Sequence, residues 1–120
     1  MSLKVTKTDL EGVLILEPEI YEDDRGFFYE SFNAKSFLEA TNFNAIFLQD
    51  NHSQSNKGVL RGLHYQTHQA QGKLVRVIEG CVYDVCVDIR KGSQSFGKWV
   101  SIELSAENKK QLLPNCMRKI

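Results

Sequence analysis

One segment of the sequence places an ionisable ring inside a pattern typical of a β-strand. If residues 60–66 form a strand, His64 and Gln66 lie on one face, because successive side chains alternate between faces. An unperturbed histidine titrates near pH ~6.5, so His64 suits the role of a general base. Arg61 would lie on the opposite face unless Gly62 introduces a bulge. A histidine that only makes structural hydrogen bonds is the alternative that stays open here.

Several charged and amide side chains stand near this segment or near expected turns. Arg25, Arg61 and Lys73 would suit a phosphorylated or carboxylated ligand if a cavity lies beside them. The run Gln-Asp-Asn at 49–51 follows an expected strand and offers both hydrogen-bond donors and acceptors. Each of these groups taken alone is more often a solvated surface side chain.

The sequence does not predict a metal site. The spacing of Gly58, His64 and Gly80 fits the metal-binding signature of cupins, G-x5-H-x-H followed later by a glycine. Gln66 replaces the second histidine of that signature, and Gln71 stands where it carries a glutamate. The remaining ligand set is poor for a divalent ion, so we expect none.

Short strands separated by turn residues dominate the chain, as in a β-sandwich, barrel or jelly roll. A short helix is also expected, with Asn33 as its N-cap and with Phe37 and Leu38 facing the core. We expect one all-β domain over residues 1–120, ending in a polar loop at 105–111 and a short tail. The expected strands cover residues 12–17, 27–32, 45–49, 59–66, 73–79, 82–90 and 97–104, and the helix covers residues 34–40.

The strand expected at residues 82–90 carries two carboxylates on one face. Asp84 and Asp88 share that face with Val82 and Cys86, while Tyr83 begins the opposite one. This arrangement fits a polar cavity inside a barrel. It fits equally well a solvent-exposed face with hydrated aspartates, because antiparallel sheets are often wet on one side.

Composition excludes several classes of protein. The 120 residues include 15 basic and 15 acidic side chains, and this balance argues against a broad grip on nucleic acid. No apolar run approaches the length of a membrane span, and no signal-peptide pattern opens the chain, so a cytoplasmic location is expected. The cysteines, Cys81, Cys86 and Cys116, form no C-x-x-C pair and predict neither a disulfide framework nor a zinc site. Cys81 and Cys86 lie in an apolar run and are expected to be buried.

Six blocks of the sequence resemble, in order, those of dTDP-4-dehydrorhamnose 3,5-epimerases. They are DRGFFYE (24–30), QDNHS (49–53), GVLRGLHYQ (58–66), GKLVR (72–76), GCVYDVCVDIR (80–90) and LSAENKKQL (104–112). The resemblance implies a cupin-type jelly roll, usually a homodimer, with no metal or organic cofactor. It implies inversion of dTDP-4-dehydro-6-deoxy-D-glucose at C3 and C5, a step in making dTDP-L-rhamnose for bacterial surface polysaccharide.

The same resemblance implies roles for individual residues. His64 corresponds to the base that removes the C3 and C5 protons, and Lys73 to the cation beside the C4 oxygen. In such dimers the strand with Arg25 and Glu30 reaches the partner's pocket. The residues that correspond to nucleotide and sugar contacts are Arg25, Glu30, Gln49, Asp50, Asn51 and Arg61.

The resemblance stops after Leu112. The family would continue with a tryptophan, a Pro-x-Gly segment, a histidine, a tyrosine acid and an aspartate that orients the base, and residues 113–120 match none of these. The sequence therefore predicts a truncated or frame-shifted member with an incomplete barrel, in which Asp84 could orient His64. Three other hypotheses stay open: a non-catalytic dTDP-sugar-binding remnant, a related 3,4-ketoisomerase of dTDP-4-keto sugars, and an open barrel that covers its missing edge by oligomerisation.

Overall fold

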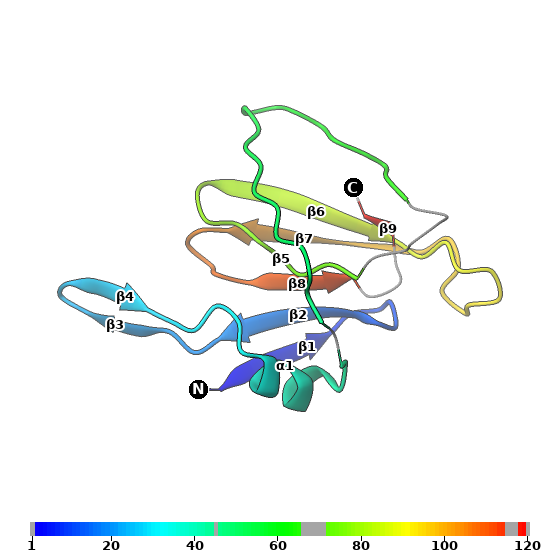
Figure 1. The fold of residues 1–120 in the computed structure, drawn as a ribbon. Helices are drawn as coiled ribbons and strands as arrows, with labels where there is room; N and C mark the ends of the chain where they lie inside the picture. Colours follow the sequence, from blue (N-terminus) through cyan, green and yellow to red (C-terminus); the bar gives the residue numbers. More distant parts are fainter. Residues whose placement is uncertain (1, 45, 66–71, 115–117, 120) are drawn as a thin grey trace.

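The computed structural model describes residues 2–44, 46–65, 72–114 and 118–119 (Figure 1). Within these ranges the chain forms antiparallel strands and one helix, α1 (Ala34–Thr41). The strands are β1 (Leu3–Lys7), β2 (Val13–Pro18), β3 (Tyr21–Asp23), β4 (Gly26–Phe28), β5 (Val75–Arg76), β6 (Cys81–Val87), β7 (Trp99–Ser105), β8 (Gln111–Pro114) and β9 (Arg118–Lys119).

Two sheets enclose the main core. The first has the strand order β1-β2-β8-β5 and the second has the order β7-β6-β9, drawn above it in Figure 1. Apolar side chains from both sheets pack together between them, and the buried ones are Leu10, Val13, Cys86, Leu104 and Leu112. In the part of the chain that the structure describes, no strand pairing joins the two sheets, so they form an open sandwich there.

Strand β8 lies inside the first sheet and is buried on both faces. It pairs with β2 on one side and with β5 on the other. Because side chains alternate along a strand, Leu112 enters the core between the sheets while Leu113 packs under α1 with Leu16 and Phe37. Full burial of each leucine contributes about 1.5–3 kcal/mol. This short strand therefore joins two cores.

The helix forms where the sequence predicts it. The side-chain oxygen of Asn33 accepts hydrogen bonds from the backbone N–H groups of Lys35 and Ser36, which satisfies two of the open donors of the first turn. Phe37 is buried as expected, but Leu38 is 41% exposed, so its predicted inward orientation is wrong. The single short helix offers the core one narrow face, and Phe37 occupies it.

The second sheet settles the question about the two aspartates. Asp84, Cys86 and Asp88 are all buried, so the interpretation of a solvated face is wrong. Cys81, at the start of β6, is exposed and donates a hydrogen bond to Glu103, which contradicts its predicted burial. The strand ends at Val87, and the carboxylate of the next residue, Asp88, accepts hydrogen bonds from the loop that follows.

Several expected strands are absent or short in the described residues. Residues 46–49 form no strand, and residues 59–65 form none apart from an isolated bridge at His64. The strand expected at 73–79 is reduced to β5, and the loop expected at 105–111 ends earlier, because Gln111 already belongs to β8. In these cases the apolar pattern of the sequence does not reveal whether a neighbouring strand is present to pair with.

The hairpin of β3 and β4 forms a small sheet of its own. It pairs Tyr21 with Phe28 and Asp23 with Gly26, and the turn expected at residues 22–26 closes it. Gly26 has a φ of 136°, a region that residues with a Cβ rarely adopt. Figure 1 shows this hairpin projecting from the side of the molecule, away from both larger sheets.

Candidate functional site

The candidate residues lie in three places along the fold. Two are in or just after the β3–β4 hairpin, five are in the segment of residues 46–65, and two are at or near β5 and β6. Figure 1 shows the 46–65 segment running from α1 to a loop beyond β6. In this order they are Arg25 and Glu30; Gln49, Asp50, Asn51, Arg61 and His64; and Lys73 and Asp84.

The 46–65 segment is exposed along its length, so its polar side chains face solvent. Gln49 donates from Nε2 to Oδ1 of Asn51 over 3.1 Å, and Arg61 donates from Nε to Oγ of Ser55 over 2.7 Å. These local hydrogen bonds hold amide and guanidinium groups in place without burying them. Such groups are available to a polar ligand.

The backbone at Gly62 removes the conflict between Arg61 and His64 that an ideal strand would impose. Gly62 has a φ of 126°, which only glycine adopts readily, and residues 59–63 form no strand. Strict alternation of side chains therefore does not apply between Arg61 and His64. The structure leaves open a common orientation for the two side chains.

His64 and Lys73 stand on either side of residues 66–71. Gln66 and Gln71 belong to that range and lie outside the described residues. Both His64 and Lys73 are exposed, and the residue after Lys73, Leu74, packs against the core under α1. The core therefore fixes the backbone next to Lys73 and leaves its ammonium group in solvent.

Asp84 lies on the inner face of β6 and is 3% exposed. Its register partner on β7 is Ile102, and it lies between the exposed Tyr83 and the half-buried Val85 in the strand. A carboxylate in this position belongs to the interior of the sandwich. A role in orienting His64 would require the ring to approach the interior from the exposed segment.

Arg25 occupies the tip of the hairpin, and its side chain is 90% exposed. Its Nε and Nη2 groups donate to the carboxylate of Asp23. These hydrogen bonds hold the pKa of Asp23 below its ordinary value, and the carboxylate in turn raises the pKa of Arg25. The described contacts use one edge of the guanidinium, which leaves Nη1 for a ligand phosphate.

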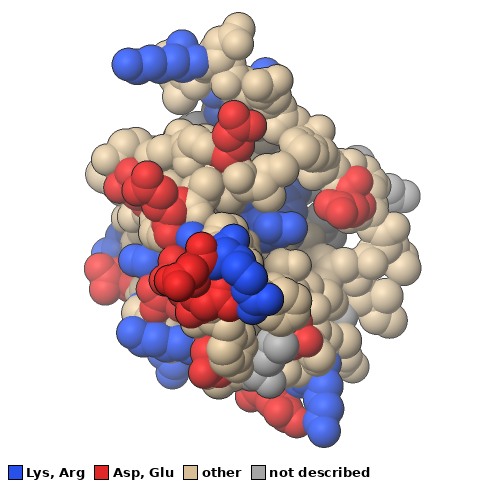
Figure 2. Space-filling view, turned by 90° about the vertical axis from the view of Figure 1, so that its left-hand side faces the viewer, with Lys and Arg blue, Asp and Glu red and all other residues tan. Residues whose placement is uncertain are grey.

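Charges of both signs are interspersed on the side of the molecule where the hairpin projects. Figure 2 shows acidic and basic side chains next to each other on this face, with no broad patch of either sign. A ligand would therefore meet individual cations such as Arg25 and not an extended positive surface.

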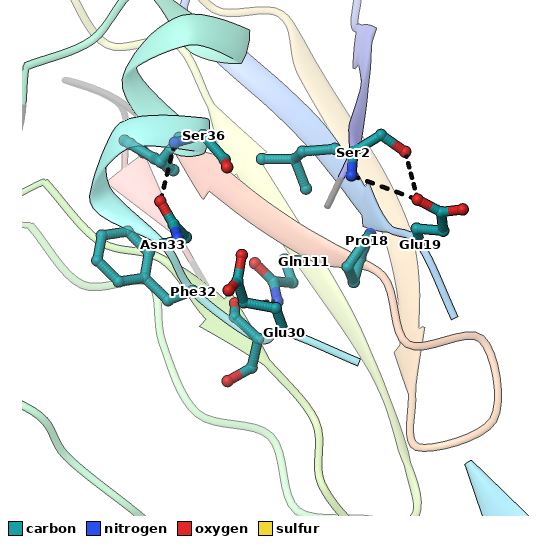
Figure 3. A pocket seen from close by; sticks show the side chains of 11 residues that line it. Ser2, Pro18, Glu19, Glu30, Phe32, Asn33, Ser36 and Gln111 are labelled. Atoms are coloured by element: carbon teal, nitrogen blue, oxygen red, sulfur yellow. Dashed lines mark hydrogen bonds between the residues drawn. The ribbon is translucent and has the colours of Figure 1, made fainter. Parts of the chain in front are cut away.

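Glu30 lines a small pocket between α1, β8 and the first residues of the chain (Figure 3). The volume of this pocket is about 20 Å³, which is enough for one water molecule and too small for a nucleotide sugar. On its far side Ser2 donates from its hydroxyl to Glu19, and this hydrogen bond lowers the pKa of Glu19. His64 and Lys73 do not line this pocket, so it is not the predicted substrate site.

The described residues include exposed ionisable and cationic side chains. Among them, no group of three or more histidine, cysteine, aspartate or glutamate side chains gathers closely enough to hold a metal ion. The imidazole of His64 and the ammonium group of Lys73 both lie on the exposed surface.

Sequence analysis missed three residues that shape the surroundings of the hairpin. Gln111 is buried and donates from Nε2 to the backbone oxygen of Ser31 over 2.9 Å, which ties the end of the hairpin segment to β8. Asn108 and Lys109 form the turn before β8, and Lys109 contacts the ring of Phe27. These residues belong to the block at 104–112 that resembles the family. From the sequence alone, a polar run before a short strand cannot be distinguished from an ordinary loop.

Comparison with known proteins gives consistent results. The family model described as dTDP-4-dehydrorhamnose 3,5-epimerase matches residues 7–116. A dTDP-4-dehydrorhamnose 3,5-epimerase from Shigella flexneri is 61% identical over 111 residues, which are 92% of this chain and 61% of the relative. The chain thus spans about three fifths of the length of this curated relative.

Two solved structures superpose closely on the chain. One is a dTDP-6-deoxy-D-glucose-3,5-epimerase from Legionella pneumophila Philadelphia 1 in complex with dTDP-4-keto-L-rhamnose; it has a TM-score of 0.93 and 52% identity, and the match covers 98% of this chain and 63% of that one. The other is a dTDP-4-dehydrorhamnose 3,5-epimerase from Bacillus anthracis with TDP and PPi bound; it has a TM-score of 0.90 and 43% identity, and the match covers 98% of this chain and 69% of that one.

Helix α1 has eight residues. No helix in the described residues is both long enough and apolar enough to cross a membrane.

The strand arrangement, the extent of the family match and the close superposition agree with one another. The chain belongs to the dTDP-4-dehydrorhamnose 3,5-epimerase family of isomerases and has its cupin-type fold.

Proposed function

We propose that residues 1–120 form a single cupin-like domain that acts in the 3,5-epimerisation of dTDP-4-dehydro-6-deoxy-D-glucose to dTDP-4-dehydro-L-rhamnose. One observation carries the proposal: a solved epimerase in complex with dTDP-4-keto-L-rhamnose superposes on nearly the whole chain. The reaction would serve dTDP-L-rhamnose synthesis for surface polysaccharide in the cytoplasm. The domain would require no metal or organic cofactor for it.

His64 is the proposed base. It takes the proton from the carbon next to the C4 ketone, and the electron pair of the broken C–H bond moves to the C4 oxygen to give an enolate. Lys73 stabilises the negative charge on that oxygen. A water molecule on the opposite face then gives the carbon a proton, which inverts it, and the hydroxide that this leaves takes the proton held by His64. A positioned base contributes roughly 10²–10⁴-fold to such a step, and a preorganised cation adds a similar factor.

The binding groups complete the proposed site. Arg25 and Arg61 contact the diphosphate, to which a guanidinium can donate two parallel hydrogen bonds. Gln49, Asp50 and Asn51 contact the nucleotide and sugar from the exposed segment, together with Glu30. In a homodimer, the projecting hairpin would carry Arg25 and Glu30 to the partner's site. The projection of this hairpin in Figure 1 supports that geometry. Asp84 would orient His64.

Solvent exchange tests the chemistry directly. In D₂O, the protein should place deuterium at C3 and C5 of the dTDP-4-keto sugar, and NMR of the sugar reads out both positions. We expect His64→Ala to lower the exchange rate by about 10²-fold or more. His52→Ala is the matched control, because His52 is another exposed histidine of the same segment with no assigned role. Absence of exchange in the unmodified protein at neutral pH would refute catalysis by this chain.

A second candidate is a dTDP-sugar-binding module without catalysis. The observation that favours it is the exposure of the polar side chains of residues 46–65, which can donate and accept hydrogen bonds to a ligand whether or not a reaction follows. Such a module should be stabilised by dTDP, since a ligand that binds the native state shifts the unfolding equilibrium by RT ln(1 + [L]/Kd). A melting temperature that rises with dTDP, without deuterium exchange, would favour this candidate. NMR of the product would also separate epimerisation from 3,4-ketoisomerisation.

A further inference from the structure

The β3–β4 hairpin cannot be held in place by its own pairing. It consists of two strands of three residues, which form a sheet separate from the others. An isolated two-stranded hairpin is marginally stable at best in water. Phe27 and Phe28 are 56% and 61% exposed, so burial of its aromatic side chains contributes little. The orientation of the hairpin must therefore depend on contacts with the rest of the molecule.

Two such contacts lie at the base of the hairpin. The ammonium group of Lys109 lies 4.3 Å from the ring centroid of Phe27, within the distance of a cation–π interaction. The same ring stacks on Tyr29, with centroids 5.9 Å apart. The hydroxyl of Tyr29 accepts a hydrogen bond of 3.4 Å from Nη1 of Arg76 in β5. Cations from two separate elements thus contact one stacked aromatic pair.

The turn that presents Lys109 is firmly built. The side chain of Asn108 accepts hydrogen bonds from the backbone N–H groups of Ser105 and Lys110, and it donates to the carbonyl of Glu103. Lys109 has a φ of 55°, a left-handed conformation that a residue with a Cβ adopts only when its surroundings fix it. The ammonium group of Lys109 also donates a hydrogen bond of 3.2 Å to the backbone oxygen of Glu107, so the turn holds both ends of this side chain.

We propose that Lys109 is a positioning residue, which holds the β3–β4 hairpin against the β7–β8 turn and thereby sets where Arg25 meets the diphosphate of a nucleotide. This inference rests on the proposed function, in which Arg25 contacts that diphosphate. Lys109 touches no reacting atom and acts through Phe27 and the short hairpin. The closing experiments separate this anchoring from the binding of dTDP.

The first experiment measures the hairpin without any ligand. Amide hydrogen exchange of residues 21–28 should become roughly two- to fivefold faster in Lys109→Met, because methionine keeps the length of the side chain and removes its charge. Lys109→Arg should restore the protection. Lys110→Met is the matched control, since Lys110 lies in the same turn and pairs with Glu17. Exchange that is unchanged in Lys109→Met, or equally faster in Lys110→Met, would overturn the proposal.

The second experiment measures dTDP affinity by calorimetry in a double-mutant cycle. Lys109→Met should weaken dTDP binding by roughly two- to fivefold in the unmodified protein and by nothing further in an Arg25→Met background. Thymidine, which lacks the diphosphate, should bind the unmodified protein and the Lys109→Met variant equally. Equal losses in both backgrounds would refute the link to Arg25. If the unmodified protein binds no dTDP, the proposed function fails, and the exchange experiment alone decides whether Lys109 anchors the hairpin.

Discussion

The sandwich of two sheets and the 46–65 segment differ in the interactions that hold them in place. In the sandwich, strands pair in register and apolar side chains from both sheets meet in a shared core. In the segment, apolar side chains such as Ile46, Leu48 and Leu60 are exposed, and the side-chain hydrogen bonds of Gln49 and Arg61 join near neighbours. The first region supplies stability, while the second displays polar groups.

This difference explains why the two regions should respond differently to substitution. Binding residues are often placed on connecting segments that a rigid scaffold holds in position. Such segments open more easily than the core, because few buried contacts oppose their movement. Substitutions in the sandwich should therefore change the free energy of unfolding, and those in the segment should change ligand affinity.

The largest expected effect is in the central strand of the first sheet. Leu112 is 1% exposed, and Leu112→Ala should lower the free energy of unfolding by about 2–5 kcal/mol, from lost burial and the cavity that remains. Leu60→Ala is the control in the segment, where 83% exposure predicts a change below about 0.5 kcal/mol. Urea denaturation measures both. Similar losses in the two variants would show that the segment is packed in solution.

A smaller effect is expected at Asp88. Its buried carboxylate accepts hydrogen bonds from Arg90, Ser93 and Ser95, and these hold its pKa well below the usual range. Asp88→Asn should lower the free energy of unfolding by about 1–3 kcal/mol at neutral pH. Asp50→Asn, in the exposed segment, should leave the free energy of unfolding nearly unchanged.

The same carboxylate predicts a pH dependence. Because its pKa is lower in the folded state than in the unfolded state, its contribution is complete above the ordinary carboxyl pKa of about 4. The contribution declines as the pH falls from there through the lower folded pKa. Thermal denaturation from pH 7 downwards should show a weaker acid dependence in Asp88→Asn. An identical acid dependence in both proteins would contradict this account.

Apart from the control variants, the smallest effect on stability is expected at Gly62. Its φ of 126° is unfavourable for alanine, so Gly62→Ala should move the backbone between Arg61 and His64. Because residues 59–63 have little packing to lose, we expect a change of about 1 kcal/mol or less in unfolding and a clearly weaker affinity for dTDP. Calorimetry with dTDP and urea denaturation test the two parts. Loss of stability without loss of affinity would reverse the assignment.

Local signals in the sequence were sufficient for part of the fold. The cap at Asn33 and the apolar run of β2 needed no knowledge of distant residues, and both elements are confirmed with bounds close to those expected. Strand β8 could not be found in this way. Its leucines follow a polar run and face opposite sides, and the strand is recognisable only through its pairing with β2 and β5. Strand β1 alternates charged and apolar residues and was also missed.

The sequence indicated which residues could form the candidate site, but it did not indicate how their side chains are arranged in space. The residue pattern indicated His64 and Lys73 as candidates, the resemblance gave them specific roles, and both occupy exposed positions. The ion pair of Arg25 with Asp23 was not foreseen, because a charged turn reads the same whether its side chains pair or remain solvated. The contact of Lys109 with Phe27 joins residues far apart in the chain, which no local pattern reveals. The roles of His64 and Lys73 in catalysis remain predictions.

The position of β8 also governs how the chain can fold during synthesis. Ile15 in β2 pairs with Leu112, so β2 acquires this neighbour only after all the residues between the two strands have been synthesised. Until then β1 and β2 can form a hairpin and α1 can cover Leu16, but Val13 and Ile15 lack their core partner Leu112. Pairing over such a sequence distance slows folding and prolongs the exposure of apolar surface. The apolar face of β2 that carries Val13 and Ile15 should therefore stay open to intermolecular contacts until residues 111–114 emerge.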